Sequence, residues 1–199
     1  MLLIGLTGGL ATGKSHVGHM LERMGAHLIQ ADQLGHQALA PDGEAYRSAV
    51  EMFGQGILDE DGQIHRKALA SVVFNQPETL EELNAIVHPA VHRLQAAIVE
   101  RIAAEDPAAI IIVEAAIHIE TGGYKRYEKL ILVVCSVEEQ IRRAVKRDNA
   151  TRDEVLARLA RQMPLEDKRK FADYVIDTSD DDVHTWHQTV EVYNQIRKL

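Results

Sequence analysis

Eight consecutive residues have the types and spacing of a phosphate-binding loop: Gly8-Gly9-Leu10-Ala11-Thr12-Gly13-Lys14-Ser15. The run fits the pattern G-x-x-x-x-G-K-[ST], and it lies between a short apolar segment and a helical pattern, as this loop requires. Its glycines let backbone N–H groups face phosphate oxygens, and the N-terminus of the following helix adds a positive dipole end. The sequence therefore predicts a phosphate site. The alternative is a glycine-rich turn that only ends a strand.

Two side chains of this loop suit phosphoryl transfer. Lys14 is expected to act in catalysis by bridging the β- and γ-phosphates of ATP, and the Ser15 hydroxyl is expected to hold Mg²⁺. The predicted ATP-binding residues are Gly8, Gly9, Leu10, Ala11, Thr12, Gly13, Lys14, Ser15 and His16.

Two carboxylates come at the ends of predicted strands. Asp32 follows the apolar pair Leu28–Ile29, and Glu114 follows the apolar run Ile110–Val113. Open α/β sheets bind ligands at the carboxyl ends of their strands. Asp32 is therefore a candidate to accept the proton of an attacking hydroxyl, and Glu114 a candidate to steer Mg²⁺ through bound water. The alternatives are an Asp that caps the next helix and a simple strand-end carboxylate.

Positive charge is concentrated in residues 142–170, which hold ten basic and five acidic side chains in a chain of net charge −8. On a helix, Arg142 with Lys146 and Arg143 with Arg147 form one basic face. This cluster favours a local anionic ligand. Arg142 and Arg147 are the predicted catalytic arginines, which would close over the transferring phosphate. For any single arginine, a solvated surface position is the alternative.

Composition limits the class of protein. An acidic chain of 199 residues argues against a nucleic-acid binder that coats phosphates with a basic surface. The longest apolar runs have six residues, which is too short to span a membrane, and no signal peptide is recognised at the N-terminus. The single cysteine, Cys135, excludes an internal disulfide and favours a reducing compartment. We expect a cytoplasmic protein with neither nucleic-acid nor membrane partners, either a monomer or a weak homo-oligomer.

Short apolar runs alternate with helical patterns, which predicts an α/β fold with a five-stranded parallel sheet and helices on both faces. The predicted strands are Leu2–Leu6, Leu28–Ile29, Ile110–Val113, Leu130–Val134 and Tyr174–Ile176. Ser136 and Thr151 each precede a Glu by three residues, the form of a capping box that starts a helix. Between residues 29 and 110 the alternation fails and a helical insertion is expected. Its helical patterns are Tyr46–Phe53, Lys67–Phe74, Glu78–Val87 and Ala90–Ala104.

Several short motifs follow the phosphate loop in a fixed order. They are Ala31-Asp32, Gly62-Gln63-Ile64-His65-Arg66, Leu83-Asn84-Ala85-Ile86-Val87-His88-Pro89, Arg147-Asp148-Asn149, Gln162-Met163-Pro164 and Ala172-Asp173-Tyr174-Val175-Ile176-Asp177. In this order and spacing, and over nearly the whole chain, they resemble the dephospho-coenzyme A kinase family. The resemblance implies ATP-dependent phosphorylation of the ribose 3′-hydroxyl of dephospho-coenzyme A.

The resemblance also implies a P-loop NTPase fold with a helical acceptor-binding insertion and a helical lid. The expected segments are a core at residues 1–58, the insertion at 59–105, core again at 106–140, the lid at 141–170 and a C-terminal core segment at 171–199. Asp32 then matches the family's catalytic base. The implied acceptor-binding residues are Thr7, Asp32, Arg66, His88 and Glu120.

The chain departs from the family pattern in three places. Gln30 stands where the family usually has an Asp, and His65 replaces the usual Asp before Arg66. The segment from Glu114 to Glu120 lacks the family's proline and has His118 at an apolar position. These departures keep open a P-loop kinase for another small acceptor, such as a nucleoside monophosphate. A second alternative is a module that binds ATP without transferring phosphate, although the intact Lys14-Ser15 pair and Asp32 argue against it.

Overall fold

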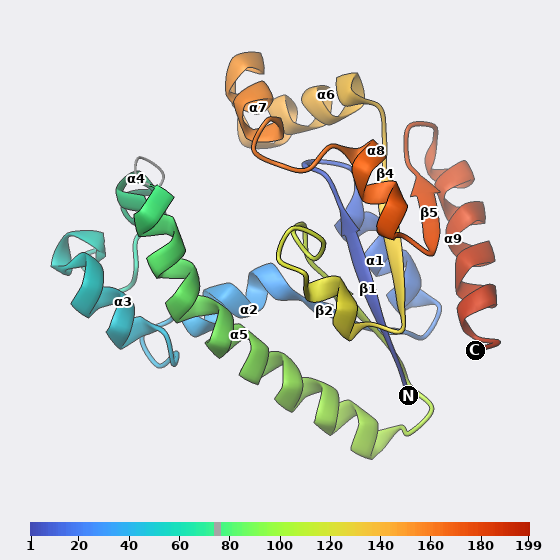
Figure 1. Ribbon diagram of the computed structural model, residues 1–199, viewed down its shortest axis with the longest axis horizontal. Helices are drawn as coiled ribbons and strands as arrows, with labels where there is room; N and C mark the ends of the chain where they lie inside the picture. Colours follow the sequence, from blue (N-terminus) through green and yellow to red (C-terminus); the bar gives the residue numbers. More distant parts are fainter. Residues whose placement is uncertain (74–76) are drawn as a thin grey trace. The chain divides into compact units, whose positions relative to one another are not determined.

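The computed structural model describes residues 1–73 and 77–199. The chain forms two compact units (Figure 1). Unit 1 consists of residues 1–30 and 105–199, and unit 2 of residues 31–104. Residues 31–58, which the family resemblance assigned to the core, therefore lie in unit 2, within the stretch where the sequence pattern predicts a helical insertion. The physical reason is that the connection after the second strand is helical from its first residue, so it packs with other helices.

Unit 1 is built on a five-stranded parallel sheet, as predicted. Its strands are β1 (Leu2–Gly8), β2 (His27–Gln30), β3 (Ile110–Glu114), β4 (Lys129–Val134) and β5 (Tyr174–Asp177). They lie in the order β2-β3-β1-β4-β5. The chain turns to one side of β1 for β2 and β3 and to the other side for β4 and β5. The carboxyl end of β1 is thus the switch point where such sheets bind ligands.

Helices α1 (Lys14–Arg23) and α9 (Asp182–Ile196) bury apolar side chains against one face of the sheet. Ile4 and Leu6 of β1 and Leu21 of α1 are fully buried in this core. On the other face Gly5 lies against the ring of Tyr127, where an added Cβ would come within 2.6 Å of the ring. The phosphate loop between β1 and α1 is therefore anchored at both ends in a closely packed core.

The remaining helices of unit 1 follow β4. They are α6 (Val137–Asp148), α7 (Arg152–Leu159) and the short α8 (Leu165–Lys168), with the 3₁₀ turn η3 (Arg169–Phe171) after α8. Another 3₁₀ turn, η2 (Gly123–Arg126), precedes β4. Both predicted caps are confirmed: the Ser136 and Thr151 side chains accept hydrogen bonds from the third backbone N–H of their helices. At Thr151 the Glu154 side chain completes the capping box.

The described part of unit 2 is helical, with one isolated bridge between Leu58 and Ile64. Its elements are α2 (Ala31–Ala38), α3 (Tyr46–Phe53), η1 (Gln55–Ile57), α4 (Arg66–Val73) and α5 (Pro77–Glu105). The predicted Tyr46–Phe53 helix is confirmed. The α4 helix starts one residue earlier than predicted, and Phe74, its predicted last residue, lies outside the described residues.

The prediction of two separate helices on either side of Pro89 is wrong. Helix α5 is one helix of 29 residues that contains this proline. A proline inside a helix removes one N–H donor and crowds the preceding turn. Here apolar side chains from both sides of Pro89, among them Ile86 and Val91, pack against the same cluster as the buried Ala90. This shared packing holds both halves in one helix. No helix in the described ranges has the length and hydropathy needed to cross a membrane.

Candidate active site

The phosphate loop leaves β1 at Gly8 and enters α1 at Lys14, as the sequence predicts. Gly13 has a φ of 85°, in the left-handed region that favours glycine. Ala11 also has a positive φ, 54°. A Cβ at Gly8 would lie 2.5 Å from the Val133 carbonyl oxygen of β4, so no side chain fits there. The loop is therefore shaped by contacts with its neighbours as well as by its glycines.

Lys14 and Ser15 both make contacts at this loop. The Lys14 ammonium donates to the Gly9 carbonyl at 2.7 Å, which folds its side chain back over the loop. The Ser15 hydroxyl donates to Glu114 Oε1 at 2.6 Å. Since the hydroxyl gives its hydrogen to the carboxylate, its oxygen lone pairs stay available for a cation.

Glu114 is buried at the end of β3, opposite Leu6 of β1 and Gln30 of β2 in the strand register. Its second oxygen, Oε2, accepts a hydrogen bond of 2.8 Å from the Gln30 amide. Gln30, one of the three departures from the family pattern, thus holds the Glu114 carboxylate that faces Ser15. Asp32 lies two residues after Gln30 in the chain, in the first turn of α2.

The oxygen donors at Ser15 and Glu114 fit a hard cation such as Mg²⁺, which usually binds through one or two protein oxygens and substrate phosphates. Across residues 1–73 and 77–199, no group of three or more His, Cys, Asp or Glu side chains is arranged to hold a metal ion. A magnesium ion here would therefore draw most of its ligands from a nucleotide and water.

Polar side chains from the C-terminal half of unit 1 hold the loop backbone. The Leu10 N–H donates to Gln162 Oε1 at 2.9 Å, and the Leu10 carbonyl accepts from the Gln140 amide at 2.7 Å. The Thr178 hydroxyl donates to the Thr12 carbonyl at 2.8 Å. Sequence reasoning included Gln162 in a family motif but missed Gln140 and Thr178. No local spacing marks such long-range contacts.

The two arginines predicted to be catalytic are paired with carboxylates of their own helix. Arg142 lies 2.5 Å from Glu139, and Arg147 lies 2.7 Å from Asp148. More than half of each arginine side chain is exposed. Asp148 also pairs with Arg158 of α7. These carboxylates therefore fix the arginine positions in the described structure.

Arg143, which shares the basic face, borders the loop through Thr178. It donates to both the hydroxyl and the carbonyl of Thr178, at 2.9 and 2.6 Å, and Thr178 in turn holds Thr12. A methyl group on Gly13 would lie 3.6 Å from its guanidinium. Arg143 was one of the four basic residues singled out, but helical periodicity did not distinguish it from Arg142 or Arg147.

The acceptor-side residues implied by the resemblance fall in both units. In unit 1, the buried Thr7 hydroxyl donates to the Ala116 carbonyl at 3.3 Å, and Glu120 pairs with Lys168 at 2.8 Å. In unit 2, the His88 ring stacks on His92, with a centroid separation of 6.4 Å. His118, another departure, is buried with Nε2 2.9 Å from the Val113 carbonyl oxygen, so it belongs to the core of unit 1.

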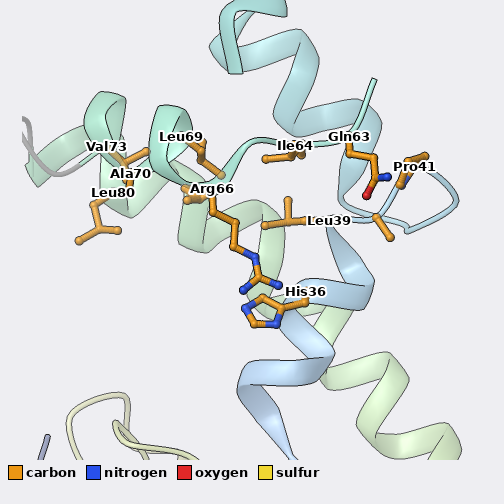
Figure 2. Close-up of a pocket in the computed structure, with 12 residues that line it drawn as sticks. His36, Leu39, Pro41, Gln63, Ile64, Arg66, Leu69, Ala70, Val73 and Leu80 are labelled. Carbon is orange, nitrogen blue, oxygen red and sulfur yellow. The ribbon is translucent and has the colours of Figure 1, made fainter. Parts of the chain in front are cut away.

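Unit 2 contains a cavity of about 350 Å³ with Arg66 and His36 in its wall (Figure 2). Most of the other lining side chains are apolar. They are Leu39, Ala40, Pro41, Ile64, Leu69, Ala70, Val73, Leu80 and Leu83, together with Gln63. Figure 2 shows the Arg66 guanidinium beside the His36 ring. Burial lowers the pKa of His36, the positive charge of Arg66 lowers it further, and Asp32 one turn earlier opposes both.

Glu139 supplies a test of the arginine pairs, because its carboxylate receives hydrogen bonds from Arg142 and Arg143. The hydrogen bond from Arg142 is the main cause that lowers the pKa of Glu139 from 4.5 to about 2. A pKa that is lower in the folded state stabilises the fold above pH 4.5, and this stabilisation is lost as the pH falls toward 2. Glu139→Gln should therefore lower the free energy of unfolding at pH 7 by about 1 kcal/mol, allowing for solvent screening.

The measurement is urea unfolding of wild type and Glu139→Gln between pH 7 and pH 3. The difference between the two should be constant above pH 5 and should shrink below pH 4.5. Glu166→Gln is the control, because this exposed residue pairs only with Arg169, at 3.2 Å, among the ion pairs of the described residues. A constant difference down to pH 3 would contradict the assignment.

Comparison with known proteins gives one consistent result. The family model of dephospho-CoA kinase (CoaE) matches residues 2–183. A dephospho-CoA kinase of Aquifex aeolicus is 40% identical over 198 residues, covering 100% of this chain and 99% of that protein. One from Geobacter sulfurreducens is 43% identical over 180 residues, covering 90% of each.

Solved structures agree. TT1252 from Thermus thermophilus superposes with a TM-score of 0.87 at 31% identity, covering 98% of this chain and 97% of that one. Dephospho-CoA kinase from Campylobacter jejuni gives a TM-score of 0.71 at 27% identity, with the same coverage. A shikimate kinase from Bacteroides thetaiotaomicron shares the fold alone, with a TM-score of 0.54 at 12% identity, covering 100% of this chain and 99% of that one. This chain belongs to the dephospho-CoA kinase family.

Proposed function

We propose that this chain transfers the γ-phosphate of ATP to the ribose 3′-hydroxyl of dephospho-coenzyme A, giving coenzyme A and ADP. The observation that carries the proposal is the phosphate loop whose Ser15 faces the buried Glu114, in a chain that matches the family over residues 2–183. The sequence motifs of unit 2 and the cavity beside Arg66 support dephospho-coenzyme A as the acceptor.

In the proposed reaction, the 3′-oxygen of the acceptor forms a bond to the γ-phosphorus. The bond from that phosphorus to the β–γ bridging oxygen breaks, and ADP leaves with the electron pair. Asp32 orients the hydroxyl and takes its proton. The loop N–H groups and Lys14 hold the phosphates, so that the reacting atoms stay in line. Removal of the proton by a positioned carboxylate makes the hydroxyl a better nucleophile than water.

A magnesium ion bound with ATP would offset the charge that develops on the phosphate oxygens. Ser15 is the proposed ligand, and Glu114 is proposed to act through bound water. The support is chemical: a hydroxyl that donates to a buried carboxylate presents its oxygen to the cation. Gln30 keeps Glu114 in place through the second carboxylate oxygen.

The cavity of unit 2 is proposed to hold the part of the acceptor beyond its ribose. Dephospho-coenzyme A has a diphosphate next to the adenosine and then a long, weakly polar pantetheine arm. His36 lies four residues after Asp32 on α2, a rise of about 6 Å along the helix. Arg66 beside it makes no ion pair within the described residues. Arg66 is therefore proposed to bind the diphosphate, and the apolar wall to contact the arm. His88 and Thr7 remain further proposed acceptor contacts.

We also propose that the protein works in the cytoplasm, without nucleic-acid or membrane partners, as a monomer or weak homo-oligomer. The net charge of −8 supports the absence of a nucleic-acid partner, since a polyanion is repelled by an acidic surface. The single, buried Cys135 is compatible with a reducing compartment.

The experiment that tests this function is an ADP-release assay with Mg²⁺-ATP and four conditions: dephospho-coenzyme A, AMP, CMP or no acceptor. Mass spectrometry of the products should show one added phosphate on dephospho-coenzyme A alone. Phosphorylation of AMP or CMP instead would identify a kinase with another acceptor. ATP binding with no phosphorylated product would favour a non-catalytic module.

Asp32→Asn tests the proposed base. The amide keeps the size of the side chain but cannot take a proton, so kcat should fall about 100-fold or more while the Kd for ATP stays within twofold. Asp42→Asn, an exposed change in the same unit, should leave kcat unchanged. Full turnover in Asp32→Asn would remove this residue from the mechanism.

Glu114→Gln tests the proposed metal role. Removal of the negative charge should raise the Mg²⁺ concentration for half-maximal rate about tenfold, because the cation loses an electrostatic partner. Glu128→Gln is the matched control, since Glu128 is exposed and contacts the Leu3 N–H at the far end of β1. If Glu114→Gln lowers only thermal stability and keeps the magnesium requirement, Glu114 is a structural strand-end carboxylate.

Arg66→Met tests the acceptor cavity. Loss of the guanidinium should raise the KM for dephospho-coenzyme A about 10- to 100-fold, because charged hydrogen bonds to phosphate are lost. The KM for ATP should not change. Lys67→Met, the exposed neighbour on α4, serves as the control in steady-state kinetics. Equal effects of both changes would show that the cavity has no specific role for Arg66.

A further inference from the structure

Lys168 of α8 has a fully buried side chain, which is unusual for a lysine. Its ammonium nitrogen lies 2.8 Å from Glu120 Oε1, 3.0 Å from the Ala116 carbonyl oxygen and 3.3 Å from the Gly8 carbonyl oxygen. A lysine ammonium has three N–H donors. Each of the three therefore has an oxygen acceptor within reach.

The three acceptors come from segments next to the phosphate site. Gly8 is the first residue of the phosphate loop. The Ala116 carbonyl also accepts a hydrogen bond from the hydroxyl of Thr7, the residue before Gly8. Glu120 accepts a second, longer hydrogen bond of 3.4 Å, from the Met163 N–H. Lys168 thus connects the start of the loop to the connection that follows β3.

The segment from Gln162 to Lys168 lies along the first three loop residues in the opposite chain direction. Lys168 reaches Gly8, and a Cβ on Gly9 would lie 3.3 Å from Leu165. Gln162 accepts the Leu10 N–H. Because Lys168 and Gln162 contact the two ends of this stretch, the segment fixes the half of the loop that lacks the support of helix α1.

Stability alone does not explain a buried ion pair here. The cost of desolvating two charges can exceed their attraction, and apolar side chains of similar volume often stabilise a protein as well. A buried charge with directed hydrogen bonds does something that an apolar residue cannot do. It fixes particular carbonyl groups in one orientation and places a positive charge close to where nucleotide phosphates bind.

We propose that Lys168 is a positioning residue for nucleotide binding. It holds the Gly8 carbonyl so that the loop N–H groups keep their phosphate-binding orientation, and Glu120 compensates its charge. Glu120 then serves the nucleotide side of the reaction, although the family resemblance implies an acceptor contact for it. The inference rests on the proposed function in taking ATP as the nucleotide and, for the Glu120 variant, dephospho-coenzyme A as the acceptor, and its test does not require turnover.

The test is equilibrium binding of the β,γ-imido analogue of ATP, with Mg²⁺, to the full-length chain. Lys168→Met keeps the apolar stem and removes the ammonium, so the Kd should rise at least tenfold. Lys170→Met is the matched control, because this exposed lysine pairs only with Asp167 among the ion pairs of the described residues, and its Kd should stay within twofold. Lys168→Arg keeps the charge and should recover at least part of the lost affinity.

A structural role would give a different result. In that case folded Lys168→Met would have a lower Tm but would bind the analogue within twofold of wild type, which would overturn the proposal. If Lys168→Met does not fold, Glu120→Gln decides, because it keeps the shape and an oxygen acceptor. Weaker analogue binding with an unchanged Kd for dephospho-coenzyme A supports the proposal. The reverse pattern would return Glu120 to the acceptor side and overturn it.

These measurements separate the inference from the proposed function. If wild type binds the analogue but does not phosphorylate dephospho-coenzyme A, the proposed function fails, and the analogue Kd still reports on Lys168. If wild type phosphorylates dephospho-coenzyme A and Lys168→Met binds the analogue normally, only the inference fails.

Discussion

The parallel register of β1 with its neighbour β3 is the constraint on which the candidate site depends. It places Glu114 opposite Leu6, two residues before the phosphate loop, so that the carboxylate reaches Ser15 at the start of α1. The next strand, β2, places Gln30 on the other side of the same carboxylate. A shift of one residue in this register would turn Glu114 to the opposite face of the sheet. The register of the three strands thus determines which side chains face Ser15 of the loop.

The loop itself is held by side chains that lie more than 120 residues away in the sequence. Gln140, Gln162 and Lys168 contact its first half, and Thr178 contacts Thr12 in its second half. Such cross-linking explains how Ala11 keeps a positive φ, which an alanine adopts only at an energetic cost. The loop conformation is therefore set largely by contacts within the folded unit.

Much of this could be predicted from the sequence, for physical reasons that differ by element. The central strands β1, β3 and β4 are continuous apolar runs, and the edge strands β2 and β5 each keep a short apolar run, so all five could be predicted, with ends within one or two residues. Glu114 could be placed because strand ends share one edge of a sheet. Pairing between distant polar side chains has no period, and therefore Lys168 looked like one more charge in a basic segment. The local helical patterns end at Val87 and begin again at Ala90, whereas packing on both sides of Pro89 joins them in one helix.

The pairing of Arg142 with Glu139 and of Arg147 with Asp148 affects how an anion approaches. Glu139 is shared by Arg142 and Arg143, and Asp148 by Arg147 and Arg158, so each carboxylate offsets only part of the charge of its two arginines. A guanidinium group has five N–H donors, so a phosphate group can bind to the donors that the carboxylate leaves unused. For an anion that binds at these arginines, the carboxylates would therefore orient the guanidinium groups rather than compete for them.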